Sequence, residues 1–372
     1  MQIVQVTTSK QKRQFIDFPH DLYEGDPNYV PAMYLDQKEV MNPKKNPFFN
    51  HSKADLFLAI REGKIVGRIA AIRNNEYIKF ANEQVGYFGF FDVIDDYSVA
   101  EALLDKAAAW VTAEGLQGLY GPTNFTTNET AGILIDGYDS PPVVWMTYNK
   151  PYYVDFLNRY GFHKRMDLFA YKVPTQTVSQ RSLDVSARLE ERLKKRGIII
   201  RNVNKRKFKQ EARTIREIYR KAWEQNWGFV PPTEEEFDHL AEGLKLIVDE
   251  EMVFIAEKDG EAIGFFLALP DINQIMIKQK RGRIIPFGIF RLLFGKKKVT
   301  ILRIILLGVL PEYRRLGIEA IFYAKIIRYA QTHNIAFGEG SWVLEDNEMM
   351  NKGMQGLNAE VYKTYRIYEK SI

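Results

Sequence analysis

The chain carries one pattern twice, and this repeat constrains its fold more than any other feature. Residues 54–72 read ADLFLAIREGKIVGRIAAI, and residues 251–269 read EMVFIAEKDGEAIGFFLAL. Each run has two apolar segments joined by a polar turn with glycine, which predicts a β-hairpin. Two similar units are therefore expected. At one constant offset the runs share these identities: Phe57/Phe254, Ala59/Ala256, Gly63/Gly260, Gly67/Gly264 and Ala71/Ala268.

The segments that follow each hairpin match as well, in the order strand, helix, strand, helix, strand. In the first copy they fall at residues 85–93, 98–114, 118–122, 152–160 and 167–173. In the second copy they fall at residues 301–310, 317–333, 336–343, 346–354 and 361–369. A strand and two helices precede the second hairpin, at residues 198–203, 207–223 and 233–248. This alternation indicates an α/β fold with a mixed sheet flanked by helices in each unit.

The length of 372 residues is long for one hydrophobic core and comfortable for two. A polar stretch at 174–184, rich in Thr, Gln and Ser, is the natural linker between the two copies. We therefore predict an N-terminal domain at 1–175 and a C-terminal domain at 183–372.

Composition excludes several classes of protein. The chain is 46% hydrophobic and 27% charged, which is typical of a globular protein. No run approaches the roughly 18 to 20 apolar residues of a membrane-spanning helix, and the first 15 residues lack the apolar core of a secretory signal. The absence of cysteine excludes disulfides and a cysteine nucleophile, and the five histidines are scattered, so no metal site is expected. We expect a cytoplasmic protein.

The most informative segment is residues 306–320, LLGVLPEYRRLGIEA. A leucine-rich strand ends at Pro311, and a turn with Arg314 and Gly317 opens a long helix. Backbone amides at a helix start point outward, the helix dipole adds positive charge, and glycine allows a phosphate to approach the backbone. The pattern therefore suits an anion site. Spacing alone equally allows a plain strand-turn-helix with an incidental arginine pair.

Strand, Pro-x-Tyr-Arg-x-x-Gly and helix together resemble the coenzyme A loop of the GNAT acyltransferase superfamily. The triplet Glu345-Asp346-Asn347 and the C-terminal strand YKTYRIYEK are similar to that superfamily too, and the repeat then resembles a tandem GNAT protein. The resemblance covers nearly the whole chain and implies two GNAT-like domains, each with a mixed, mostly antiparallel sheet flanked by helices. It implies acyl-CoA or acetyl-CoA as co-substrate, without a metal. Some bacterial relatives of this kind N-acylate lipid amines such as sphingoid bases.

The resemblance also assigns roles to single residues. The edge formed by Leu307 and Val309 would pair with the pantetheine arm, and Asn347 would touch that arm. Arg314 would lie near the pyrophosphate. The pyrophosphate would be held by the backbone amides of Arg315, Leu316, Gly317, Ile318, Glu319 and Ala320.

One position departs from the superfamily pattern, because Glu319 stands where glycine or alanine is usual. A carboxylate repels a pyrophosphate unless its side chain turns outward. Three interpretations follow, in order of preference. Glu319 faces solvent as a favourable acid in the first helical turn, or the donor is phosphopantetheine on a carrier protein, or the site has lost coenzyme binding.

The first copy has a different turn at this place. It reads Asp92-Val-Ile-Asp-Asp96, with three carboxylates and neither arginine nor glycine. We interpret this domain as degenerate and non-catalytic, helping to form an acceptor groove. Residues 121–129 and 148–153 could line that groove or be ordinary loops.

Amine acylation needs a base and a group that protonates the leaving thiolate. Glu339 is the base candidate, because a carboxylate within a strand needs a reason; the alternative is a residue that faces solvent or pairs with a cation. Tyr365 is the acid candidate together with Tyr362, although tyrosines in such a strand usually pack. Residues 223–231, WEQNWGFVP, could grip an apolar acceptor or cap the core.

Residues 277–298, IKQKRGRIIPFGIFRLLFGKKK, contain eight Lys or Arg and no acid. Phe287, Phe290 and Phe294 recur at helical spacing between the flanking cations. This pattern suits an interfacial helix on an anionic membrane, or a core helix framed by solvated charges. Nucleic acid is not an expected partner, because no nucleic-acid motif accompanies the patch.

We therefore expect an acyl-CoA-dependent N-acyltransferase in which a lipid-like amine attacks the thioester directly. The alternatives are a carrier-protein donor or a hydroxyl acceptor, and, in another class, a non-catalytic GNAT-fold protein that binds lipid or a partner.

Overall fold

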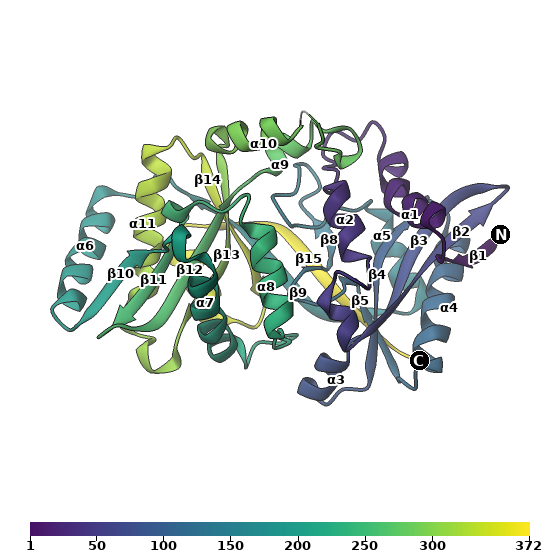
Figure 1. Ribbon diagram of the computed structural model, residues 1–372, viewed down its shortest axis with the longest axis horizontal. Coiled ribbons are helices and arrows are strands. Elements are labelled where there is room, and N and C mark those ends of the chain that lie inside the picture. The colour runs from purple at the N-terminus through teal and green to yellow at the C-terminus, as the bar shows by residue number, and fades with distance from the viewer. Residues whose placement is uncertain (287) are drawn as a thin grey trace. The chain divides into compact units, whose positions relative to one another are not determined.

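A computed structural model describes residues 1–286 and 288–372 (Figure 1). The chain forms two compact units, and each unit takes segments from distant parts of the sequence. The first unit comprises Met1–Leu168, Ile275–Ile289 and Lys363–Ile372, and the second comprises Phe169–Gln274 and Phe290–Tyr362. The division at 1–175 and 183–372 stays a prediction about domains.

The first unit is built on a sheet with the strand order β1-β2-β3-β4-β5-β15. The β4–β5 pair is parallel and its other neighbouring pairs are antiparallel. Its strands are β1 (Gln2–Gln5), β2 (Lys53–Arg61), β3 (Lys64–Arg73), β4 (Val85–Val93), β5 (Gly118–Gly121), β8 (Ile133–Asp136), which pairs with β15, and the 363–371 part of β15 (Glu360–Ser371). A separate small sheet joins β6 (Thr123–Asn124) and β7 (Thr130–Ala131).

Helix α4 (Tyr97–Ala113) covers one face of this sheet, and its apolar stripe is fully buried. Leu103 and Val111 on this helix have no exposed surface. Gly67 on β3 allows the close approach, since a Cβ there would lie 2.7 Å from Leu103 Cδ1. The helices of the unit are α1 (Ser9–Leu22), α2 (Tyr34–Val40), η1 (Pro47–Asn50), α3 (Asn75–Ala81), α4 (Tyr97–Ala113) and α5 (Tyr152–Tyr160).

The second unit has a sheet with the order β14-β13-β12-β11-β10, in which β13 and β14 are parallel and the other pairs antiparallel. Its strands are β10 (Ile198–Asn202), β11 (Val253–Lys258), β12 (Glu261–Pro270), β13 (Ile301–Val309) and β14 (Phe337–Leu344), and β9 (His163–Pro174) contributes its residues from Phe169 onward. Its main helices are α6 (Gln180–Lys194), α7 (Phe208–Trp223), α8 (Glu234–Leu244), α11 (Ile318–Thr332) and α12 (Glu348–Gly356).

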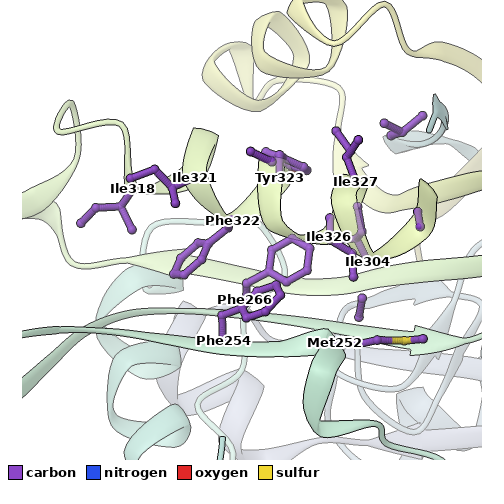
Figure 2. Packing of buried hydrophobic residues seen from close by; sticks show 14 of the residues in the cluster. Met252, Phe254, Phe266, Ile304, Ile318, Ile321, Phe322, Tyr323, Ile326 and Ile327 are labelled. Atoms are coloured by element: carbon purple, nitrogen blue, oxygen red, sulfur yellow. The ribbon is translucent and has the colours of Figure 1, made fainter. Parts of the chain in front are cut away.

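The core of the second unit lies between this sheet and α11. Figure 2 shows Phe322 of α11 pointing at Phe254 and Phe266 of the hairpin, and the Phe254 and Phe322 rings lie 6.3 Å apart and nearly parallel. Phe266 and Phe322 have no exposed surface. Burial of one such ring stabilises the fold by about 1.5–3 kcal/mol.

The two hairpins confirm the repeat in detail. Both central turn residues have positive φ in each copy, at Glu62 and Gly63 (+52° and +75°) and at Asp259 and Gly260 (+52° and +90°). Two positive φ values define the type I′ turn that matches strand twist. A β-bulge follows Ala59 in the first hairpin and Ala256 in the second, one repeat apart.

Some elements were not predicted from the sequence. Helix α6 begins within the polar stretch expected as a linker, at Gln180, and Ser179 caps it by accepting a hydrogen bond from the Ser182 amide. The helices α1, α2 and α3 were also not predicted. Their apolar residues are too few and too irregular to stand out before packing partners are known.

The segment between β12 and β13 forms only short elements. They are α9 (Asn273–Met276), η4 (Lys280–Gly282), α10 (Gly288–Gly295) and η5 (Lys296–Lys298); the remaining 3₁₀ turns are η2 (Lys205–Lys207), η3 (Glu250–Met252) and η6 (Pro311–Tyr313). Phe287 of the predicted stripe lies outside the described residues. Across the described residues, no helix combines the length and apolar character that crossing a bilayer requires.

Candidate active site

Strands β13 and β14 diverge at the place where the sequence suggested a cofactor. Among the described residues, their paired register covers Ile301–Ile304 opposite Phe337–Gly340 and does not extend beyond it. A β-bulge between β12 and β13 lies at the point where the divergence begins. The rest of β13 therefore has an edge that β14 does not cover.

Leu307 and Val309 present their backbone groups to this edge. The Leu310 amide donates to the Ile263 carbonyl of the opposite side at 2.9 Å. Because backbone groups alternate in direction along a strand, those of Leu307 and Val309 point the other way. Their carbonyls accept side-chain hydrogen bonds instead, from Trp223 Nε1 to Leu307 at 3.2 Å and from Arg314 Nε to Val309 at 3.2 Å.

The start of α11 lies directly after this edge. The first intrahelical acceptor is the Gly317 carbonyl, which accepts from the Ile321 amide at 3.3 Å. The helix itself therefore offers no acceptor to the amides of residues 318–320, and the N-cap Gly317 has no side chain to cap them. Amides in this arrangement, with the helix dipole behind them, favour an anion.

Two residues of the turn have left-handed backbone conformations. Gly317 has φ +81° and Arg315 has φ +74°. A left-handed arginine costs energy relative to an ordinary conformation, and such strain is concentrated at functional sites. Arg315 is exposed. Arg314 instead ties the turn down, because its Nη2 also donates to the Ala222 carbonyl at 2.8 Å.

Glu319 and Asn347 have local roles. Glu319 is half-buried in the first turn of α11, and its charge adds to burial in raising the pKa of Tyr323. Asn347 caps α12, because its Oδ1 accepts from the Met350 amide at 3.1 Å. The contact of Asn347 with a pantetheine arm stays a prediction.

Glu339 lies within a network of buried polar side chains in the second unit. It has no exposed surface, so the alternative of a solvent-facing residue is wrong. Its Oε1 accepts from Ser341 Oγ at 2.5 Å, and its Oε2 accepts from the Tyr362 hydroxyl. Arg303, opposite Glu339 in the strand register, donates from Nε to Ser341 Oγ at 3.0 Å.

Tyr365 is placed differently from Tyr362. It belongs to the first unit, where it is fully buried and faces Leu134 across the β15–β8 pair. Glu339 belongs to the second unit, so the role of Tyr365 as its acid partner stays a prediction. Arg303 and Ser341 were missed in the sequence, although an arginine inside the apolar run of β13 and a serine two residues after Glu339 are detectable signals.

In the first unit, the edge of β4 and the start of α4 correspond to the edge of β13 and the start of α11, and side chains of the first unit bond to both. The Phe90 amide on β4 donates to Asn124 Oδ1 at 2.7 Å, and the Val93 amide donates to the Tyr153 hydroxyl at 2.9 Å. Helix α4 is capped by Asp96, which accepts from the Ser98 amide at 2.9 Å and pairs with Arg61 at 2.7 Å. In the second unit, by contrast, the helix start at Gly317 has no side-chain cap, and the edge carbonyls of Leu307 and Val309 accept from Trp223 and Arg314.

Among the described residues, no group of three or more His, Cys, Asp or Glu is arranged to hold a metal ion.

Comparison with known protein families matches one family to part of this chain. The Acetyltransferase (GNAT) family matches residues 212–349, which include β13, the turn and α11.

Two curated relatives match along nearly the whole chain. Protein YghO from Escherichia coli (strain K12) is 36% identical over 97% of this chain and 93% of its own length. Bacterial ceramide synthase from Caulobacter vibrioides (strain NA1000 / CB15N) is 33% identical over 100% of this chain and 98% of its own length.

Solved structures share the fold. A tandem GNAT protein from the clavulanic acid biosynthesis pathway superimposes with a TM-score of 0.59 at 12% identity, covering 100% of this chain and 98% of that one. A GCN5-related N-acetyltransferase from Sphaerobacter thermophilus gives a TM-score of 0.51 at 11% identity, covering 99% and 95%. The chain therefore belongs to the GNAT family of acyltransferases and has the fold of its tandem members.

Proposed function

We propose that the protein transfers an acyl group from acyl-CoA to the amine of a lipid-like acceptor, and that the second unit carries the reaction. The observation behind this proposal is the continuity of two features, an uncovered strand edge at Leu307 and Val309 and a helix start at Gly317 with outward amides. The first suits an extended amide-containing arm, and the second suits phosphates.

In this proposal the amides of residues 315–320 hold the pyrophosphate, except that of Leu316, which donates to the Tyr313 carbonyl at 3.4 Å. The pantetheine arm lies along Leu307 and Val309. An amide of that edge polarises the thioester carbonyl. Removing one such donor typically raises the barrier by about 3–4 kcal/mol. The acceptor amine attacks the carbonyl carbon, the N–C bond forms, the C–S bond breaks, and coenzyme A leaves as a thiolate that takes up a proton.

Glu339 serves as the base that keeps the amine neutral, and Tyr365 is the proposed acid. The lipid character of the acceptor rests on the relative named Bacterial ceramide synthase, since a ceramide is an N-acylated lipid amine. The aromatic segment at 223–231 would contact the apolar part of such an acceptor.

We also propose that α10 brings the protein to an anionic membrane surface. Phe290 and Phe294 are 57% and 75% exposed, and Leu292 is fully buried and anchors the helix. Three lysines, Lys296–Lys298, follow this helix directly. Burial, together with the charge of neighbouring Lys205, lowers the pKa of Lys296. Exposed rings beside crowded cations suit anionic headgroups. Vesicles with phosphatidylserine should co-sediment the parent but not Phe290→Ser/Phe294→Ser; equal sedimentation would contradict this contact.

Thermal shift with coenzyme A tests the donor site, because a ligand that binds the folded state raises its melting temperature. Gly317→Ala should abolish the shift, since its Cβ would meet Leu189 Cδ2 at 2.7 Å and strain the turn. Gly115→Ala is the matched control, because Gly115 has a similar φ of +79° in open space of the first unit. A parent without any shift would favour a carrier-protein donor or the non-catalytic alternative.

A further inference from the structure

The polar network around Glu339 is unusual because charged groups on two parallel strands are buried together. Arg303 on β13 is 3% exposed, Ser341 on β14 is 4% exposed, and Glu339 is fully buried. A buried carboxylate or guanidinium costs several kcal/mol unless it is paired and hydrogen-bonded. Such an arrangement at the divergence of β13 and β14 indicates a functional use more than a gain in stability.

Two hydroxyl groups donate to the Glu339 carboxylate. Ser341 Oγ donates to Glu339 Oε1, and the Tyr362 hydroxyl donates to Glu339 Oε2, so both carboxylate oxygens have a hydroxyl donor. Arg303 contacts Ser341 directly. It holds Ser341 twice, from Nε to Oγ at 3.0 Å and from Nη2 to the Ser341 carbonyl at 3.3 Å. These two bonds fix the rotamer of Ser341. The guanidinium of Arg303 is on the strand next to Glu339, directly opposite it in the register.

Tyr362 differs from the other members because it is half-buried. Its ring meets Phe337 edge-on at 6.1 Å, and Lys172 Nζ lies 4.9 Å from the Phe337 ring. Two charged or titratable groups near Glu339 are Arg303 from β13 and Tyr362 from β15. Lys172 from β9 lies against the Phe337 ring that Tyr362 also contacts. Tyr362 therefore links the fully buried carboxylate to a half-buried side chain.

We propose that these residues form a proton relay, in which Arg303 and Ser341 are positioning residues and Tyr362 is the outer member. The relay deepens the proposed function and rests on it. As the amine attacks the thioester, its N–H proton passes to Tyr362 Oη while the Tyr362 proton passes to Glu339 Oε2. Arg303 and Ser341 hold Glu339 ionised and oriented to receive it.

The first test follows thiol release from palmitoyl-CoA with sphinganine as acceptor in the full-length protein, across pH. The chain has no cysteine, so a thiol reagent detects only coenzyme A. Removing a donor or the cation disfavours the ionised carboxylate. Tyr362→Phe, Ser341→Ala and Arg303→Met should move the acidic limb of kcat upward by about one to two pH units, the size expected for one hydrogen bond to a charged group. KM for palmitoyl-CoA should stay within about twofold.

Arg303→Lys should restore part of the shift because the charge remains. Tyr323→Phe is the matched control, since Tyr323 is buried in the same unit and its hydroxyl has no partner among the described residues. A limb that does not move in Tyr362→Phe and Ser341→Ala would overturn the relay.

A second readout does not need activity. With [5-¹³C]glutamate in the full-length protein, the Glu339 signal is assigned by its loss in Glu339→Gln. Its titration should move upward in the same three variants. If the parent protein releases no thiol but the Glu339 titration still moves in the variants, the acyl transfer is refuted and the coupled network stands. If the Glu339 titration does not move in the variants, the network itself is refuted.

Discussion

The indole Nε1 of Trp223 donates a hydrogen bond to the carbonyl oxygen of Leu307, over 3.2 Å. Trp223 ends α7, and its ring packs against Tyr219 with centroids 4.9 Å apart. In the proposed site, an amide of the pantetheine arm would donate to this same Leu307 carbonyl. The C-terminal end of α7 and the proposed cofactor therefore compete for the same acceptor.

This competition predicts a fluorescence signal. Coenzyme A should shift the tryptophan emission of the parent to longer wavelength, because the Trp223 indole becomes more exposed to water when the arm displaces it from the Leu307 carbonyl. Trp223→Phe should lose most of that shift, while a thermal shift with coenzyme A still reports binding. An equal emission change in Trp223→Phe would show that the indole keeps its place.

Glu319→Ala should strengthen coenzyme A binding. The substitution removes a negative charge from the helix start and restores the residue type usual there, and a gain of about 1 kcal/mol corresponds to roughly fivefold in Kd. The gain should shrink at high salt. Calorimetry measures it. Glu235→Ala removes an exposed first-turn acid from α8 and serves as the control; unchanged or weaker binding in Glu319→Ala would mean that the carboxylate turns outward.

Acid should destabilise the first unit through His20. Burial and then the charge of Arg68 lower its pKa from 6.5 to about 4, and its Nδ1 lies 2.9 Å from the Tyr29 hydroxyl. The unfolded chain takes up the proton first, so this contribution is complete above pH 6.5 and is lost as pH falls toward 4. Allowing for partial exposure, the loss is about 2 kcal/mol.

Denaturant unfolding between pH 4 and pH 7 checks this prediction. His20→Gln should show a flatter dependence of the unfolding free energy on pH. A variant as pH-sensitive as the parent would place the effect on other groups.

Deleting residues 363–372 should destabilise the first unit selectively. These residues pair with β5 from Tyr368 opposite Gly121 to Ser371 opposite Gly118, and Arg366 holds Asp167 with two bonds of 2.7 and 2.9 Å. Hydrogen exchange should accelerate in β5, because its edge amides lose their partner. The β11–β12 hairpin is the internal control, and equal acceleration there would contradict a selective effect.

Local chemistry explains which parts of the fold were predictable. The hairpins at Gly63 and Gly260 and the turn at Gly317 are determined by glycine, polar turn residues and apolar alternation within about twenty residues, so they can be read directly. Helix α6 was missed because its apolar face is sparse and is buried only by packing against α11 and β10; the Lys325–Glu190 and Arg328–Leu183 contacts tie it to α11.

In the candidate site, too, local sequence features were predictable and long-range contacts were not. The strand-turn-helix motif and Glu339 were found because each is a local anomaly. Arg303, Ser341 and Tyr362 meet only through strand pairing and side-chain reach, so spacing in the sequence does not join them. The assignment of residues 363–372 to the first unit depends on pairings more than 200 residues apart in sequence, for which no local pattern exists.

The position of residues 363–372 in the first unit has a consequence for biosynthesis. Because residues 363–372 complete the sheet that begins at Gln2, the amino-terminal unit cannot reach its final fold while the ribosome is still translating the second one. Its unpaired strand edge stays available to chaperones or to neighbouring nascent chains until then.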